Sequence, residues 1–136
     1  MSWIEPKTNW TEEDYYNFDD LNRVESNTEY LVDLVETYST RPNIGDTKTD
    51  WGITDFPFAD DIGRAETNID LIRQQTYTPL DWTPAKLDWS TLDGFGYEEA
   101  NRLERNLVAL YVMINLIKES LLYCGTFSCG QGNTEL

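Results

Sequence analysis

Carboxylate side chains that stand next to one another are the first feature of this sequence that could do chemistry. They occur at Glu12-Glu13-Asp14, Asp19-Asp20 and Asp60-Asp61. Paired carboxylates serve glycoside hydrolysis and calcium binding, but neither EF-hand spacing nor an apolar pocket around an acid is evident here. Acids also stabilise the first turn of a helix through its dipole. We therefore expect these pairs to be solvated helix starts, with no catalytic role and no cofactor.

Other reactive residue types are few. The chain has no histidine, the commonest general base and metal ligand, and no glycine-rich phosphate-binding loop. Cys124 and Cys129 can form a disulfide or supply half of a zinc site, but no second pair of ligands is evident. We expect reduced structural thiols, no metal site, and a protein that is not an enzyme.

The composition indicates one folded domain of 136 residues. Hydrophobic residues make up 40% of the chain and aromatic residues 13%, too much for a disordered acidic tail. The 25 acidic and 10 basic residues give a formal net charge of −15. Such a surface repels nucleic-acid phosphates and anionic membranes, so we expect neither as a partner. The N-terminus has no secretory signal, which predicts a protein that begins its life in a cytoplasm.

One set of residues recurs three times at fixed spacing. The stretches 8–27, 49–68 and 87–106 each hold a tryptophan followed 13 residues later by an arginine. The aligned residues are Trp10, Asp14, Arg23, Glu25 and Asn27; Trp51, Asp55, Arg64, Glu66 and Asn68; and Trp89, Asp93, Arg102, Glu104 and Asn106. Repeats of about 38–41 residues predict units that cannot bury their apolar faces alone and therefore pack together.

The Arg-x-Glu-x-Asn part of the repeat has two interpretations. On a helical wheel Glu25 and Asn27 flank the core, and Arg23 points further out. We favour a structural role, in which arginine or asparagine reaches an acid of a neighbouring helix or the carbonyls of the tryptophan turn. The other interpretation is a surface presented three times to a partner. The sequence leaves open whether the arginines face inward or outward.

These residues must be positioned by a turn and a helix in each repeat. Thr11, Gly52 and Ser90 follow the tryptophans, with an acid three residues on, and predict a short first helical turn. Acids at 19–20, 60–61 and 98–99 then open a longer helix, in which apolar residues lie three and four apart. The expected fold class is all-α: a three-helix bundle built from three Trp-turn and helix repeats with long irregular connectors.

The predicted boundaries are a single domain over 1–136, repeats at about 8–38, 49–76 and 87–123, and an exposed tail over 125–136, where Gly125, Gly130 and Gly132 indicate the helix stop. The connectors 39–59 and 77–96 are long enough to return along a helix. The helices can therefore be parallel, with pseudo-threefold symmetry, or run up-down-up. The segment 81–84 looks like a partial extra copy of the tryptophan turn. Residues 107–117, apolar nearly all round, predict a central helix or an oligomer interface.

The runs TNWTEEDYYNFDDLNRVESNTEYL, EEANRLERN and CGTFSCG resemble a segment of virion structural proteins, commonly tail- or baseplate-associated, of bacteriophages that infect Gram-positive bacteria. The resemblance covers most of the chain and brings no enzymatic activity or binding residues with it. It implies a non-enzymatic subunit of a virion, assembled in the host cytoplasm in multiple copies beside other virion structural proteins. With no fibre part after residue 136, we expect a free-standing adaptor or decoration in the tail, baseplate or neck.

Two alternatives belong to other functional classes. An acidic protein of this charge can mimic DNA and bind a basic, DNA-handling host protein. A carbohydrate-binding module would present Trp3 or Trp82 on a flat exposed face.

Overall fold

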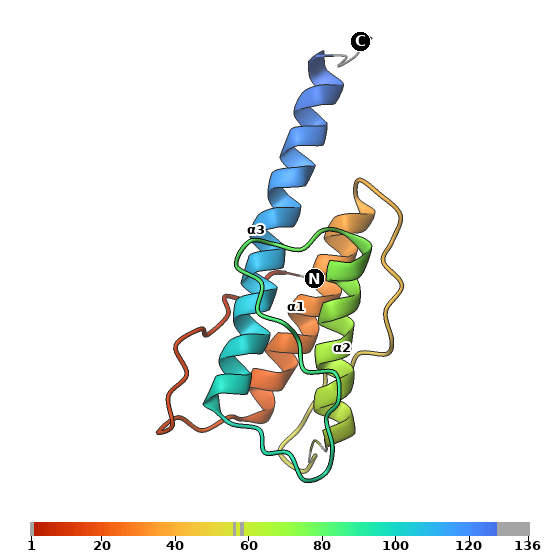
Figure 1. Cartoon of the computed structure of the whole chain (residues 1–136). Coiled ribbons are helices and arrows are strands. Elements are labelled where there is room, and N and C mark those ends of the chain that lie inside the picture. Colours follow the sequence, from red (N-terminus) through yellow and green to blue (C-terminus); the bar gives the residue numbers. More distant parts are fainter. Residues whose placement is uncertain (1, 56, 58, 128–136) are drawn as a thin grey trace.

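The protein is a parallel three-helix bundle. The structure, a computed structural model, describes residues 2–55, 57 and 59–127. Within these residues it has no strand and three helices: α1 (Phe18–Glu36), α2 (Ala59–Gln75) and α3 (Tyr97–Phe127). Every pair of helices is in contact, which confirms the predicted all-α bundle. Figure 1 shows the helices running in the same direction while the connectors return along the outside, so the up-down-up alternative is wrong.

The acids predicted to open the helices do so through hydrogen bonds to the backbone. Asp20 accepts the N–H of Asn17 at 2.7 Å, and Glu99 accepts the N–H of Gly96 at 2.7 Å. Each acid thereby satisfies one of the backbone donors that the start of a helix leaves without a partner.

The short first turn predicted directly after each tryptophan is present, and it does not continue as a helix. A single turn closes there: the N–H of Asp14 donates to the carbonyl of Thr11 at 3.1 Å, and the carboxylate of Asp14 accepts the N–H of Thr11 at 2.9 Å. The equivalent bonds join Asp55 to Gly52 and Asp93 to Ser90. This is the same bond that opens α1 and α3, so it closes the turn without deciding whether a helix follows.

The core consists of layers in which equivalent residues of the three repeats meet. Leu31, Ile72 and Leu110 hold the same position of their repeats, and each is 0% exposed. Thr28 takes one polar place in a layer, and its hydroxyl donates to the carbonyl of Val24 at 2.8 Å. Parallel helices with layers in register give the bundle pseudo-threefold symmetry.

Helix α3 is longer than predicted. It continues through Gly125 to Phe127 instead of ending near residue 123, because one glycine in a helix costs only about 1 kcal/mol relative to alanine and does not by itself end it. The tail therefore does not begin at 125. Gly130, Gly132 and Cys129 lie outside the described residues. Figure 1 shows α3 extending well past the ends of α1 and α2.

The repeats begin earlier than predicted. Trp3, Ile44 and Trp82 each precede the tryptophan of their repeat by seven residues, and all pack against the main core. The segment 81–84 is therefore not an extra copy of the tryptophan turn. It is the third copy of an entry segment that the other two repeats also have.

Candidate functional site

The repeated glutamates form three equivalent polar contacts, which we call the ties, one at each boundary between helices. At the boundary of α1 and α3, Glu104 accepts Trp10 Nε1–H at 2.8 Å. Arg23 donates to the same carboxylate through Nε and Nη2, both at 2.7 Å. A planar guanidinium and a carboxylate joined by two bonds are a strong and geometrically specific pair.

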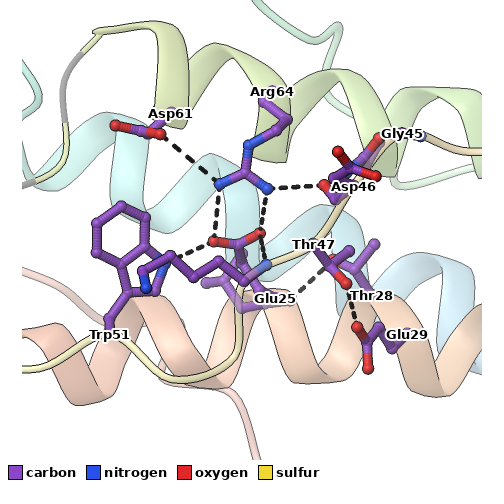
Figure 2. Close-up of polar contacts among 12 residues, drawn as sticks. Glu25, Thr28, Glu29, Gly45, Asp46, Thr47, Trp51, Asp61 and Arg64 are labelled. Carbon is purple, nitrogen blue, oxygen red and sulfur yellow. Dashed lines mark hydrogen bonds and ion pairs between the residues drawn. The ribbon is translucent and has the colours of Figure 1, made fainter.

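The tie between α1 and α2 repeats this geometry (Figure 2). Glu25 accepts Trp51 Nε1–H at 2.6 Å and Arg64 Nη1 at 2.9 Å. Arg64 also donates to the carbonyl of Asp46 at 2.7 Å and lies 3.9 Å from Asp61. The guanidinium thus joins α1, α2 and the connector between them.

The tie between α2 and α3 completes the set. Glu66 accepts Trp89 Nε1–H at 2.9 Å, and Arg102 donates to it through Nε at 2.5 Å and Nη2 at 2.9 Å. In each tie the tryptophan and the arginine belong to one repeat and the glutamate to the preceding one, with the first repeat bonding to the last. The ties therefore form a closed ring, and the arginines face the neighbouring helix.

The glutamates lie deeper than the helical wheel suggested. Glu25, Glu66 and Glu104 are only 1%, 1% and 0% exposed. A buried carboxylate is tolerated when hydrogen bonds and an opposite charge replace its water, and each glutamate has an arginine and an indole N–H. The hydrogen bond to Glu104 raises the pKa of Arg23, and the bond to Glu66 raises the pKa of Arg102. The ties are thus compensated ion pairs.

The repeated asparagines hold the entry segments. Each side-chain amide accepts a backbone N–H and donates to a backbone carbonyl of the segment that precedes the tryptophan of its own repeat, at 2.8–2.9 Å. The pairs are Asn27 with Ile4, Asn68 with Gly45 and Asp46, and Asn106 with Thr83. The amide therefore substitutes for a β-ladder partner and fixes an irregular segment against the bundle.

Three lysines belong to the motif and were missed by the sequence reasoning. Lys7, Lys48 and Lys86 lie over the rings of the repeat tryptophans, at 5.0, 5.1 and 5.4 Å from the centroids. They also pair with the turn aspartates at 3.5–3.8 Å. The signal was available, because a lysine stands three residues before each tryptophan, just outside the aligned stretches.

The second repeat lacks one contact that the others have. Asn22 exchanges two hydrogen bonds with the backbone of Trp51, and Asn101 does the same with Trp10, at 2.7–3.0 Å. The equivalent position facing Trp89 is Gly63, which has no side chain to offer. Trp89 is accordingly the more exposed of the three tryptophans.

The two remaining tryptophans are half-buried. Trp3 stacks on Tyr111 with the ring centroids 4.1 Å apart, and the guanidinium of Arg73 lies 5.5 Å from the ring of Trp82. One face of each indole is therefore already covered, which weighs against a flat platform for sugars.

In the part of the chain that the structure describes, no group of three or more His, Cys, Asp or Glu side chains could hold a metal ion. Over the same residues, no helix combines the length and apolar character needed to cross a membrane. Comparisons with protein families, curated proteins and solved structures found no match for this chain. The repeated residues bond to one another across the helix boundaries.

Proposed function

We propose that this chain is a non-enzymatic structural protein of a bacteriophage particle, an adaptor or decoration subunit of the tail, baseplate or neck that acts through protein–protein interfaces. One observation carries the proposal: the motif written three times is engaged inside the molecule. Its indole N–H groups, guanidinium groups and carboxylates bond to one another across the helix boundaries.

A closed ring of compensated ion pairs favours a rigid body. Each tie joins two helices and holds the tryptophan of its repeat, so relative sliding of the helices would break several charge-assisted hydrogen bonds at once. Rigidity of this kind suits a subunit that bridges others, because little order has to be gained on assembly. The likeness of the Trp-turn and NR-x-E-x-N helix to phage tail and baseplate segments supports the same function.

The test is an inventory of purified particles by quantitative mass spectrometry. A structural subunit is expected at a fixed, integral ratio to the major tail or capsid protein through successive density-gradient steps. Loss of the protein from particles that keep their infectivity and their other tail proteins would refute the proposal. A host protein of similar abundance, followed through the same gradients, controls for carry-over.

The net charge of −15 favours a second candidate, an acidic mimic of DNA that binds a basic host protein. Association with such a partner would weaken steeply as salt rises, because it depends on replaced counterions. A titration against candidate DNA-handling proteins at low salt tests it, and absence of binding there removes it.

A further inference from the structure

The outward face of α3 differs from the equivalent faces of the other two repeats. Because the repeats are in register, each of the following positions of α3 can be compared with the same position of the other two repeats. The position six residues after the arginine is Glu29, Asp70 and Val108 in the three repeats; ten residues after it, Asp33, Gln74 and Val112; and fourteen residues after it, Thr37, Thr78 and Leu116. Of those compared, Asp70 is buried, and Thr37 and Thr78 follow the ends of α1 and α2. At all three positions the first two repeats have polar side chains and the third has an apolar one.

These apolar side chains border a groove. Val112 is 52% exposed and Leu116 59% exposed. Beside them a groove of about 730 Å³ runs between α3 and the connector that follows α2, and Pro79 and Leu80 form part of its other wall. Leu80 is fully exposed. A contiguous apolar surface of this kind on a soluble domain marks a contact with another molecule.

The part of α3 that passes beyond the bundle is apolar on its other side too. Glu36, the last residue of α1, is equivalent to Asn115, so residues 116–127 of α3 have no helix opposite them, over about 18 Å. Ile117 and Leu121 continue the three-and-four spacing of the core after Ile114. Leu121 is half exposed. The extension therefore offers a helix that needs an apolar groove, and the same molecule offers the groove.

The charges along the last part of α3 favour a groove occupant without net charge. Lys118 and Glu119 are the only charged residues between Arg105 and Glu135, and they cancel, although the whole chain carries −15. The nine residues after Phe127, SCGQGNTEL, contain one large apolar residue and are unsuited to cover the face. A basic partner would find no acidic cluster here, whereas an uncharged apolar helix fits.

We propose that the occupant is a second copy of this chain: two copies pair with their α3 helices antiparallel, each extension lying in the groove of the other. An isologous pair uses both surfaces of both copies, which leaves neither exposed. The antiparallel direction places the two acidic bundles toward opposite ends of the pair, and the α3 segments that meet carry almost no net charge. This inference rests on the geometry of α3 and of the connector that follows α2, and does not depend on membership of a virion.

The test is the mass of the full chain in solution, measured by sedimentation equilibrium from about 1 µM to about 1 mM with a reductant present. The decisive variant is Val108→Glu/Val112→Asp/Leu116→Thr, which gives α3 the side chains that the first repeat carries at the same positions, two within α1 and one at its C-cap, and is therefore compatible with a folded bundle. Leu92→Thr is the matched control, because Leu92 is an apolar side chain 94% exposed in the turn before α3.

The wild-type chain and the control are expected to dimerise. The triple variant should dimerise with a Kd at least about thirtyfold higher, as expected when central interface side chains are replaced, with unchanged helical circular dichroism. Dimerisation should also strengthen as salt rises, because salt screens the repulsion between two acidic bundles. A wild-type chain that stays monomeric over the whole range would overturn the proposal and leave the groove to a different protein. A dimer that the triple variant leaves intact would overturn it equally.

Discussion

Single residues of this protein carry most of the specificity of its fold. The three buried glutamates would be costly in an ordinary apolar core, since a carboxylate that loses its water must find replacement bonds. Here each one receives an arginine and an indole N–H from the next repeat. Apolar side chains can pack in several registers of one helix against another, whereas a buried carboxylate meets its hydrogen-bond partners in few of them.

Removing the cation of one tie tests this account. Arg64→Met is expected to lower the free energy of unfolding by about 3–5 kcal/mol, because it leaves Glu25 buried without its opposite charge. Arg41→Met is the matched control: Arg41 also bonds two acids, Asp33 and Glu36, but all three side chains are about half exposed. It should change stability little. Urea unfolding of both variants measures the difference, and equal losses would contradict the importance of burial.

Tyr16 gives a second test at this scale. Burial raises the pKa of its hydroxyl, and that hydroxyl has no hydrogen-bond partner in the described part of the structure. Tyr16→Phe removes a polar group that is desolvated without compensation, so stability should stay level or rise by up to about 1–2 kcal/mol. Tyr15→Phe, at an 86% exposed position, should have no effect. A marked loss in the first variant, seen by urea unfolding, would mean that the hydroxyl bonds to an internal water.

At the scale of elements, the second repeat lacks a contact that the other two repeats have. Asn22 and Asn101 hold the backbone of the tryptophan in the next repeat, and Gly63 does not. A Cβ at Gly63 would lie 3.4 Å from the Cβ of Trp89, which is close to ordinary contact. The site therefore admits a Cβ in contact with Trp89.

We predict that Gly63→Asn stabilises the protein by about 0.5–1.5 kcal/mol. It supplies the missing hydrogen bonds to the backbone of Trp89 and replaces a glycine inside a helix. The reverse change, Asn22→Gly, should destabilise the protein by more. Chemical unfolding compares the two, and destabilisation by Gly63→Asn would show that the indole of Trp89 cannot move aside.

The tryptophan turns should respond to acid. The N–H of Thr11 lowers the pKa of Asp14, and the N–H of Ser90 lowers the pKa of Asp93. The charged form is thus favoured in the folded state, so these groups stabilise the fold above their unfolded pKa of about 3.9, and this contribution is lost as the pH falls through the lowered value. As the pH falls below about 5, the free energy of unfolding should decrease less in the double variant Asp14→Asn/Asp93→Asn than in the wild type. Urea unfolding of both proteins at several pH values in that range measures the difference. The same dependence of stability on pH in both proteins would contradict the prediction.

Local pattern predicted the elements well and their contacts less well. The spacing of Leu21, Val24 and Leu31 is a property of one helix, and the acids at helix starts act within one turn, so both could be read from the chain. The direction in which Arg23 points depends on which helix lies beside α1. A local sequence pattern does not contain that information. The lysines before each tryptophan were missed for a simpler reason: the alignment began one residue too late. Gly125 was predicted to mark the end of the last helix, but α3 continues past it to Phe127.

At the scale of the whole molecule, parallel helices and long connectors make a ring out of a linear chain. The contact between the first and last repeats joins residues 81 and 94 positions apart in the sequence, Arg23 and Trp10 with Glu104. It uses the same groups as the contacts between adjacent repeats. Contacts of such high sequence separation slow folding, because much of the chain must be ordered before they form.

A ring held by three equivalent boundaries has no privileged starting point. Covalent connection supplies two of its junctions and non-covalent contact alone supplies the third, so which junction lacks the covalent connection should be interchangeable. A circular permutant that begins at residue 40, joins residue 127 to residue 2 through a flexible glycine-serine linker and ends at residue 39 is expected to reach the native helicity and unfold cooperatively. Permutants opened inside α1 should not, and a permutant opened at residue 40 that fails as they do would show that the order of synthesis matters to this architecture.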